Sequence, residues 1–141
     1  MFKKILIAND GSEGAFKALD AALRLAHSHK AQAHMICVEE TQWIPGSREE
    51  VIGDKEIADR KFAEVVAKSE VEAKHHRVKL ISHVLVGHPV PAIVDFIERD
   101  GDGFDLLVAG FMGHSALYNR VIGSTTDRLV ELAPCAVLIM K

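Results

Sequence analysis

The hydrophobic positions of this chain form short continuous runs, and between the runs apolar residues recur every three or four positions. Runs of this length, rich in β-branched and aliphatic residues, predict buried strands. They lie at residues 3–8, 32–38, 80–86, 105–109 and 135–140. Because the runs are continuously apolar and are separated by helical stretches, they predict a parallel sheet covered by helices on both faces.

The periodic stretches predict four helices, so the expected order of elements is βαβαβαβαβ. In chain order the helices are expected to end near His29, near His76, before the turn at 100–103 and before Pro134. The first follows turn and cap residues at 9–12, and the second begins near Asp54, after an irregular stretch that includes Gly53. We expect the fourth helix to be capped by Ser124.

This pattern predicts one three-layer α/β/α domain over residues 1–141, a length near the commonest domain size. Five parallel strands joined by right-handed crossovers have two usual orders, 3-2-1-4-5 and 2-1-3-4-5. Periodicity does not choose between them.

Composition narrows the class of protein. Hydrophobic residues make up 48% of the chain and charged residues 26%, and no stretch approaches the roughly 20 apolar residues of a membrane span. The apolar run that follows Met1 is too short for a signal peptide, so we expect a cytoplasmic protein, in which Cys37 and Cys135 are reduced thiols. A net charge of -3 gives no reason to expect nucleic acid as a partner.

The segment between the fourth strand and the fourth helix carries the candidate chemistry. Gly110 is followed by Gly113, and after nine more residues by Gly123, Ser124 and Thr125 at the start of a helix. Glycines allow positive φ and close approach of the backbone to a ligand, and a helix N-terminus offers free N–H groups and partial positive charge. We therefore expect a phosphate cradle, different from both the dinucleotide and the Walker patterns.

These residues resemble the universal stress protein family, whose ATP-binding members carry G-x2-G-x9-G-[ST] at this place. The motif matches in full register, and the resemblance covers nearly the whole chain. Further matching segments are residues 5–12, 87–89, 105–108 and 133–139.

The resemblance implies the 3-2-1-4-5 order of the adenine nucleotide alpha hydrolase-like fold and bound ATP, ADP or AMP, with Mg²⁺. It implies adenine near Asp10 and the backbone of Ala8 and Val38, and a homodimer through the strand at 135–140. The implied phosphate-binding residues are Gly110, Met112, Gly113, His114, Ser115, Gly123, Ser124 and Thr125.

Several points stay open from the sequence. Many relatives have small, basic and glycine residues where this chain has Phe111, Met112 and Ala116, and bulk there would lower affinity. Asp10 suits both a ligand contact and a turn-forming helix cap. Neither the pair His27 and His29 nor the adjacent His75 and His76 has the spacing of a metal-ligand set.

Three functions are compatible with these features. The favoured one is an ATP-binding regulatory or stress-response protein, acting in its occupied state on an unidentified protein partner. The second is slow Mg²⁺-dependent ATP hydrolysis assisted by His114, although the chain lacks a Walker lysine and an evident catalytic base. The third is a homodimer that works by protein contact without nucleotide.

Overall fold

The structure is a computed structural model that describes residues 1–40, 48–101, 103–111 and 122–141, with the side chains of 48–59 left out. In this part of the chain, strands and helices alternate as predicted. The elements are β1 (Lys4–Ala8), α1 (Glu13–His29), β2 (Gln32–Glu39), α2 (Arg48–His75), β3 (Leu80–Val86), α3 (Pro89–Arg99), β4 (Leu106–Gly110), α4 (Ser124–Leu132) and β5 (Ala136–Met140).

The strands form one parallel sheet in the order β3-β2-β1-β4-β5. The 3-2-1-4-5 order is therefore confirmed, and the alternative 2-1-3-4-5 is excluded. In the centre of the sheet, Ile5 of β1 pairs with Ala33 of β2 on one side and with Leu106 of β4 on the other. The connection that leaves β1 leads to β2 on one side of the sheet, whereas the connection that leaves β4 leads to β5 on the other side. The topological switch point therefore lies between β1 and β4.

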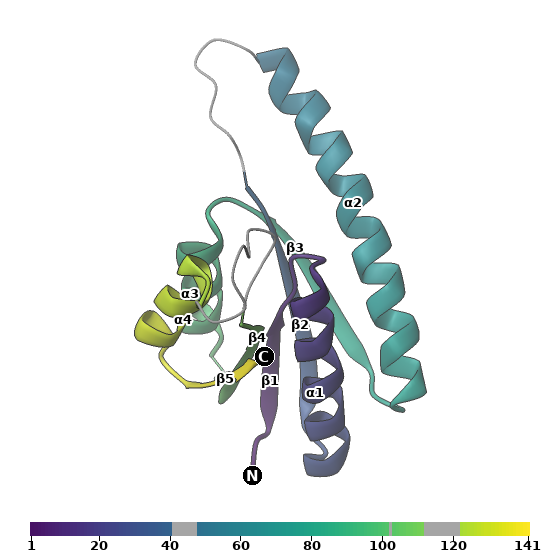
Figure 1. Cartoon of the computed structure of the whole chain (residues 1–141), viewed down its shortest axis with the longest axis vertical. Helices are drawn as coiled ribbons and strands as arrows, with labels where there is room; N and C mark the ends of the chain where they lie inside the picture. Colours follow the sequence, from purple (N-terminus) through teal and green to yellow (C-terminus); the bar gives the residue numbers. More distant parts are fainter. Residues whose placement is uncertain (41–47, 102, 112–121) are drawn as a thin grey trace.

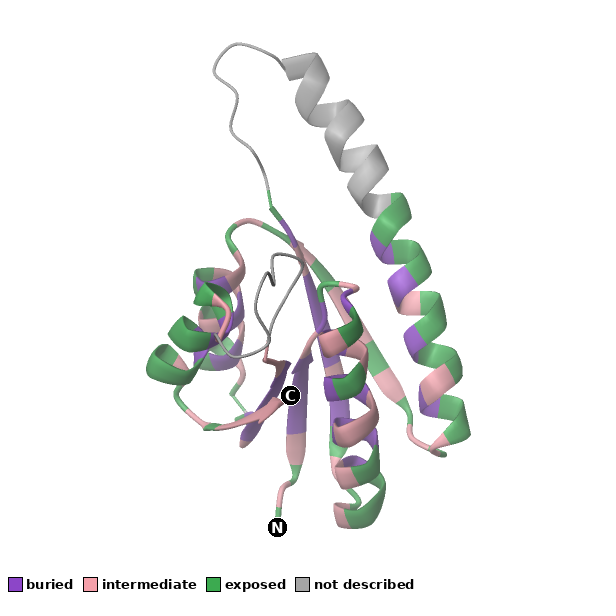
Figure 2. Cartoon of the chain, viewed as in Figure 1, coloured by how far each residue is buried: buried purple, intermediate pink, exposed green. Residues whose placement is uncertain are grey.

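Helices cover both faces of the sheet, with α3 and α4 on one side and α1 and α2 on the other (Figure 1). Apolar residues of α1 and α2 pack with Ile5, Ile7 and Met35 in one buried cluster. Residues of α3 and α4 pack with Leu6 and Ile36 in a second cluster on the opposite face. The central strands are buried between these layers (Figure 2), which accounts for their continuous apolar runs.

Two helix starts differ from the sequence expectation. Helix α2 begins at Arg48 and includes Gly53, which was expected in an irregular stretch. A single glycine costs about 1 kcal/mol in a helix, and this segment offsets it with many glutamate, lysine, arginine and alanine residues. Helix α4 is not capped by Ser124, because Gly123 takes the cap position with φ −63° and Ser124 is already helical.

The cap of α1 is as expected. The Ser12 hydroxyl accepts a hydrogen bond from the Ala15 N–H, at 3.2 Å, and the helix ends at His29, followed by Lys30 in the left-handed conformation. Among the described residues, no helix combines the length and the apolar character needed to cross a membrane.

Candidate functional site

A cleft of about 490 Å³ opens at the carboxyl ends of β1, β2 and β4, beside the topological switch point. Open α/β sheets bind their ligands at this place. Its walls combine apolar side chains with polar groups. The described lining residues are Ala8, Asn9, Asp10, Ser12, Ala15, Ile36, Val38, Glu39, Glu40, Lys61, Phe62, Pro89, Ile93, Ala109, Gly110, Gly123, Ser124, Thr125, Thr126 and Leu129.

The cleft brings together predicted site residues that are far apart in the sequence. Those that line it are Ala8, Asp10, Val38, Gly110, Gly123, Ser124 and Thr125. The other predicted residues, Met112, Gly113, His114 and Ser115, lie outside the described residues, as does Ala116. The expected phosphate contact at 113–115 therefore stays a prediction.

The turn between β1 and α1 is held by its own side chains. The Asn9 Oδ1 accepts from the Gly11 N–H at 2.9 Å, and the Asp10 Oδ1 accepts from the Ser12 N–H at 2.9 Å. Asn9 is buried, and its amide nitrogen donates to the Ser69 hydroxyl of α2 at 3.3 Å. Asp10 is thus a turn-forming residue, and its exposed carboxylate also borders the cleft.

The opposite wall is the N-terminus of α4. The Gly123 N–H donates to the Phe111 carbonyl at 3.0 Å, so it is already engaged. Within the described part of the chain, no acceptor contacts the N–H groups of Ser124, Thr125 and Thr126, which are the first of the helix. The free donors at this wall therefore belong to residues 124–126, one position later than expected.

Gly110 has a structural reason to be glycine. A Cβ at this position would lie 2.7 Å from the carbonyl carbon of Gly14 and 3.0 Å from the Ala15 nitrogen, so α1 packs directly on the end of β4. The Gly110 carbonyl also accepts from the Thr126 hydroxyl at 2.8 Å, which ties β4 to α4. Neither Gly110 nor Gly123 has a positive φ, so the conformational freedom expected of them is not used.

Helix α2 contributes cleft residues that the sequence did not suggest. Lys61 and Phe62 line the cleft, although neither belongs to the glycine segment or to the strand ends where the site was expected. Glu39 and Glu40 at the end of β2 add carboxylates beside Asp10. No local motif marks Lys61 and Phe62, because only the crossover of α2 above the sheet brings them to the cleft, whereas Glu39 and Glu40 directly follow Val38 at the end of β2.

The two thiols are structural. Both cysteines are free, and Cys37 is fully buried beneath α1 and α2. Burial, with a smaller effect from the Asp10 carboxylate, raises the pKa of Cys37 to about 12. Burial also raises the pKa of Cys135. Since the thiolate is the reactive form, the raised pKa values lower the reactivity of both thiols near neutral pH.

Comparison with known proteins defines the class. The sequence matches the universal stress protein family over residues 1–141, so the chain belongs to this family. Universal stress protein MJ0531 of Methanocaldococcus jannaschii is 29% identical over 143 residues, which span 100% of this chain and 83% of that protein.

Solved structures share the fold. Universal stress protein UspA from Lactobacillus plantarum superposes with a TM-score of 0.87 at 23% identity, covering 99% of this chain and 98% of that one. A universal stress protein in complex with cAMP gives 0.77 at 22% identity, covering 99% and 97%. A family protein from Arabidopsis thaliana with AMP bound gives 0.68 at 17% identity, covering 99% and 91%. Adenine nucleotides are thus ligands of structural neighbours.

Proposed function

We propose that this chain is a nucleotide-dependent regulatory protein of the stress response, which binds ATP with Mg²⁺ in the cleft. The observation that carries the proposal is the meeting of the α4 N-terminus with the β1–α1 turn at the topological switch point. A helix N-terminus with free N–H groups attracts phosphate. The cAMP and AMP held by structural neighbours share an adenosine and a phosphate, which fits the two kinds of wall.

The apolar wall suits the adenosine. Ala8, Val38 and Ile36 border the cleft at the ends of β1 and β2, and a flat base packs well against such side chains. The Asp10 carboxylate beside them is an acceptor for the adenine amine or a ribose hydroxyl. We therefore expect the base to lie on the β1–β2 side of the cleft.

The polar wall suits the phosphates. The N–H groups of Ser124, Thr125 and Thr126 are backbone donors that need no particular side chain, so Phe111 and Met112 do not remove them. We add Lys61 of α2 to the predicted site as a cation that borders the same cleft. It would supply a positive charge that many relatives carry in the glycine segment.

The oxygen atoms of the cleft suit a metal-bound nucleotide. The carboxylates of Asp10, Glu39 and Glu40 are among the described lining groups. Mg²⁺ prefers oxygen ligands and is commonly bound by one or two carboxylates together with the phosphates of a nucleotide. We therefore expect ATP to bind more tightly with Mg²⁺ than without it.

Strand β5 supports the expected homodimer. It forms the edge of the sheet beside β4 and carries the apolar sequence of Ala136–Met140. An open edge strand presents unpaired backbone groups that a second copy can cover. We propose that two chains pair through β5, at the opposite edge of the sheet from β3.

The proposal is tested by what the purified protein contains. The protein is denatured, the released small molecules are identified by chromatography and mass spectrometry, and stripped protein is titrated with ATP and Mg²⁺. We expect released ATP, ADP or AMP and binding in the micromolar range, and the ATP to ADP ratio over time measures any slow hydrolysis. A protein that releases no nucleotide and binds none would instead favour a dimer that acts by protein contact.

A further inference from the structure

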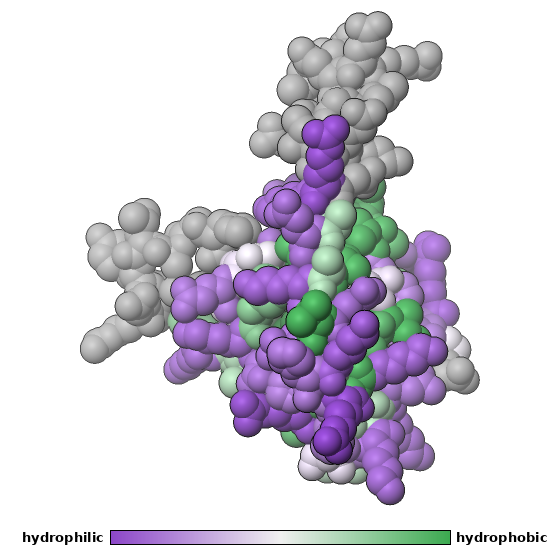
Figure 3. Space-filling model, turned by 90° about the vertical axis from the view of Figure 1, so that its right-hand side faces the viewer, coloured by the Kyte–Doolittle hydropathy of each residue, from purple (hydrophilic) through white to green (hydrophobic). Residues whose placement is uncertain are grey.

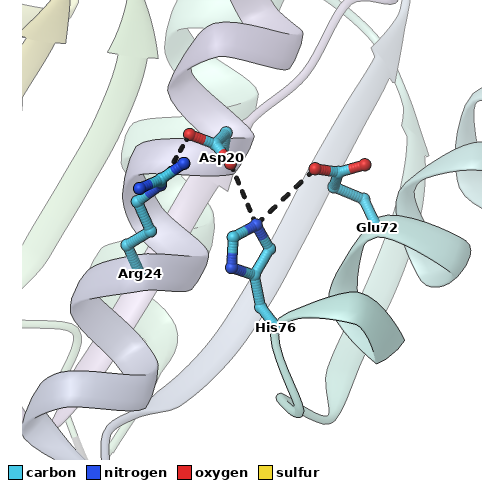
Figure 4. A network of polar contacts seen from close by, with 4 residues as sticks. All are labelled: Asp20, Arg24, Glu72 and His76. Atoms are coloured by element: carbon cyan, nitrogen blue, oxygen red, sulfur yellow. Dashed lines mark hydrogen bonds and ion pairs between the residues drawn. The ribbon is translucent and has the colours of Figure 1, made fainter.

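Three side chains that can ligate a metal converge on the outer side of the α1 and α2 layer (Figure 4). Asp20 lies on α1, Glu72 lies on the last turns of α2, and His76 directly follows α2. The His76 Nε2 lies 2.9 Å from the Asp20 Oδ1 and 3.6 Å from the Glu72 Oε1. One ligand atom from each residue lies within 4.8 Å of the other two.

The two separations from the His76 Nε2 are compatible with a tetrahedral ion. Zn²⁺ binds histidine nitrogen and carboxylate oxygen at about 2.0–2.2 Å, so two ligand atoms of a tetrahedral site lie about 3.3 Å apart. The observed separations of 2.9 and 3.6 Å from the His76 Nε2 lie on either side of that value. An imidazole with two carboxylates favours a borderline cation such as Zn²⁺ over Mg²⁺, which prefers oxygen alone.

The ligands are positioned by neighbouring groups. The Arg24 Nε contacts the other oxygen of Asp20 at 2.9 Å, which orients this carboxylate and leaves its Oδ1 toward His76. The backbone N–H of His76 donates to the backbone carbonyl of Glu72 at 3.2 Å, and Arg77 adopts the left-handed conformation that ends the helix. Such second contacts on metal-binding carboxylates are common at real sites.

The three side chains are accessible to solvent. The face that carries α1 and α2 is mostly hydrophilic, with apolar residues among the hydrophilic ones (Figure 3). The side chains of His76, Asp20 and Glu72 are 21%, 39% and 42% exposed, so an ion can enter and water can complete its coordination.

We propose that Asp20, Glu72 and His76 form a binding site for a divalent cation of the Zn²⁺ class, which links α1 to the end of α2. The two helices come from distant parts of the sequence, and the ion would join them as a cross-link of the folded state. The proposal does not depend on nucleotide binding, because none of the three residues lines the cleft.

The test uses the full chain without an affinity tag, after treatment with a chelator and in the absence of nucleotide. ZnCl₂ is titrated calorimetrically, and CoCl₂ is titrated by visible absorption, which reports coordination geometry directly. We expect one ion per chain, the absorption of a low-coordinate cobalt site, and a higher thermal midpoint with Zn²⁺ present. No saturable binding of either ion at one per chain would overturn the proposal.

Variants identify the ligands. His76→Gln and Glu72→Gln should each weaken Zn²⁺ binding at least tenfold and remove the cobalt spectrum. The matched control is His75→Gln, since His75 is the exposed neighbouring imidazole at the end of α2 and should leave both unchanged. If folded His76→Gln and Glu72→Gln proteins bind Zn²⁺ as tightly as the original, or if His75→Gln abolishes binding, the assignment is wrong.

Discussion

At the carboxyl ends of its strands the sheet borders an open cleft, whereas near their amino ends polar groups are joined to one another. In the cleft, the first N–H groups of α4 have no acceptor among the described residues. Near the amino ends, Asp105 accepts from the N–H groups of Lys3 and Lys4 at 2.8 and 3.0 Å. The Lys4 ammonium forms a 2.6 Å ion pair with Asp100.

Aromatic rings also pack near the amino ends of the strands, which we call the closed end of the sheet. The His34 Nδ1 and the His83 Nε2 lie 3.0 Å apart on neighbouring strands, and Phe104 packs edge-on against His34. The Lys4 ammonium lies 4.7 Å from the centre of the Phe104 ring. Both ends of the sheet are rich in charge, so charge does not distinguish them. The difference is that backbone donors line the cleft at residues 124–126, while most polar groups named at the closed end contact one another; the buried His34 Nε2 has no partner among the described residues.

The largest expected effect comes from closing the space between β4 and α1. In Gly110→Ala the new methyl group would meet the α1 backbone at 2.7 Å, which backbone movement alone can relieve. We expect the free energy of unfolding to fall by about 2–3 kcal/mol, as in other overpacked positions. Urea denaturation measures this loss.

The control for this change is Gly101→Ala, because no atom lies within 4 Å of a Cβ built there. Equal stability of the two variants would contradict the close approach of α1 to Gly110.

The next largest effect is expected on ligand binding, with the fold unchanged. In Gly123→Val the cap of α4 keeps a φ of −63°, which valine adopts readily, but a branched side chain is added beside the free donors. We expect ATP affinity to fall at least tenfold, about 1.4 kcal/mol, by titration calorimetry. Gly101→Val at the closed end serves as the control and should bind ATP normally.

A smaller effect is expected from Lys61. Its exposed ammonium borders the cleft, and exposed charge pairs contribute about 0.2–1 kcal/mol. Lys61→Gln should therefore weaken ATP binding up to about fivefold, with a smaller difference at high salt. The control is Lys74→Gln, an exposed lysine on the same helix away from the cleft. Identical affinities for the two variants would remove Lys61 from the site.

The smallest effect is a pH dependence of stability at the closed end. Burial lowers the pKa of His34, and the neighbouring His83 and Lys4 lower it further while Asp100 opposes them. Burial, followed by Lys4, also lowers the pKa of His83. Because both pKa values are lower in the folded protein, the unfolded chain takes up protons first as the pH falls.

Folding stability should therefore be at its full value above about pH 6.5 and decline as the pH falls through the lowered pKa values of the folded protein. A proton on each imidazole would also set two donors against each other across the 3.0 Å contact. Urea denaturation at pH 7.5 and 5 measures the decline. His83→Phe should make this decline in stability smaller. The control is His27→Gln at an exposed position, which should leave the decline unchanged.

Much of the fold was predictable, because a parallel sheet buried on both faces imposes continuous apolar runs. The run at 80–86 matches β3 at both ends, and the end of α1 at His29 was also predicted. The start of α2 was missed, since Gly53 signals a break that the rest of the helix overrides. The strand order came from the family resemblance, because periodicity does not contain it.

Only the parts of the site that lie in short sequence motifs were predictable. A turn after β1 and a helix start after β4 leave sequence signals, so Asp10 and Thr125 were named and both border the cleft. Lys61 reaches the cleft only through the packing of α2, and the contact of His76 with Asp20 joins residues 56 positions apart. Such contacts depend on how helices cross, which spacing along the chain does not report.

The central claim is that the cleft end binds the nucleotide and the closed end does not. It is tested most directly by two-dimensional amide NMR spectra of the isotope-labelled protein during titration with ATP and Mg²⁺. We predict saturable shifts at the amides of Asp10, Ser124 and Thr125, with His34 and His83 unchanged. Absence of saturable shifts, or shifts concentrated around His34 and His83, would contradict the account.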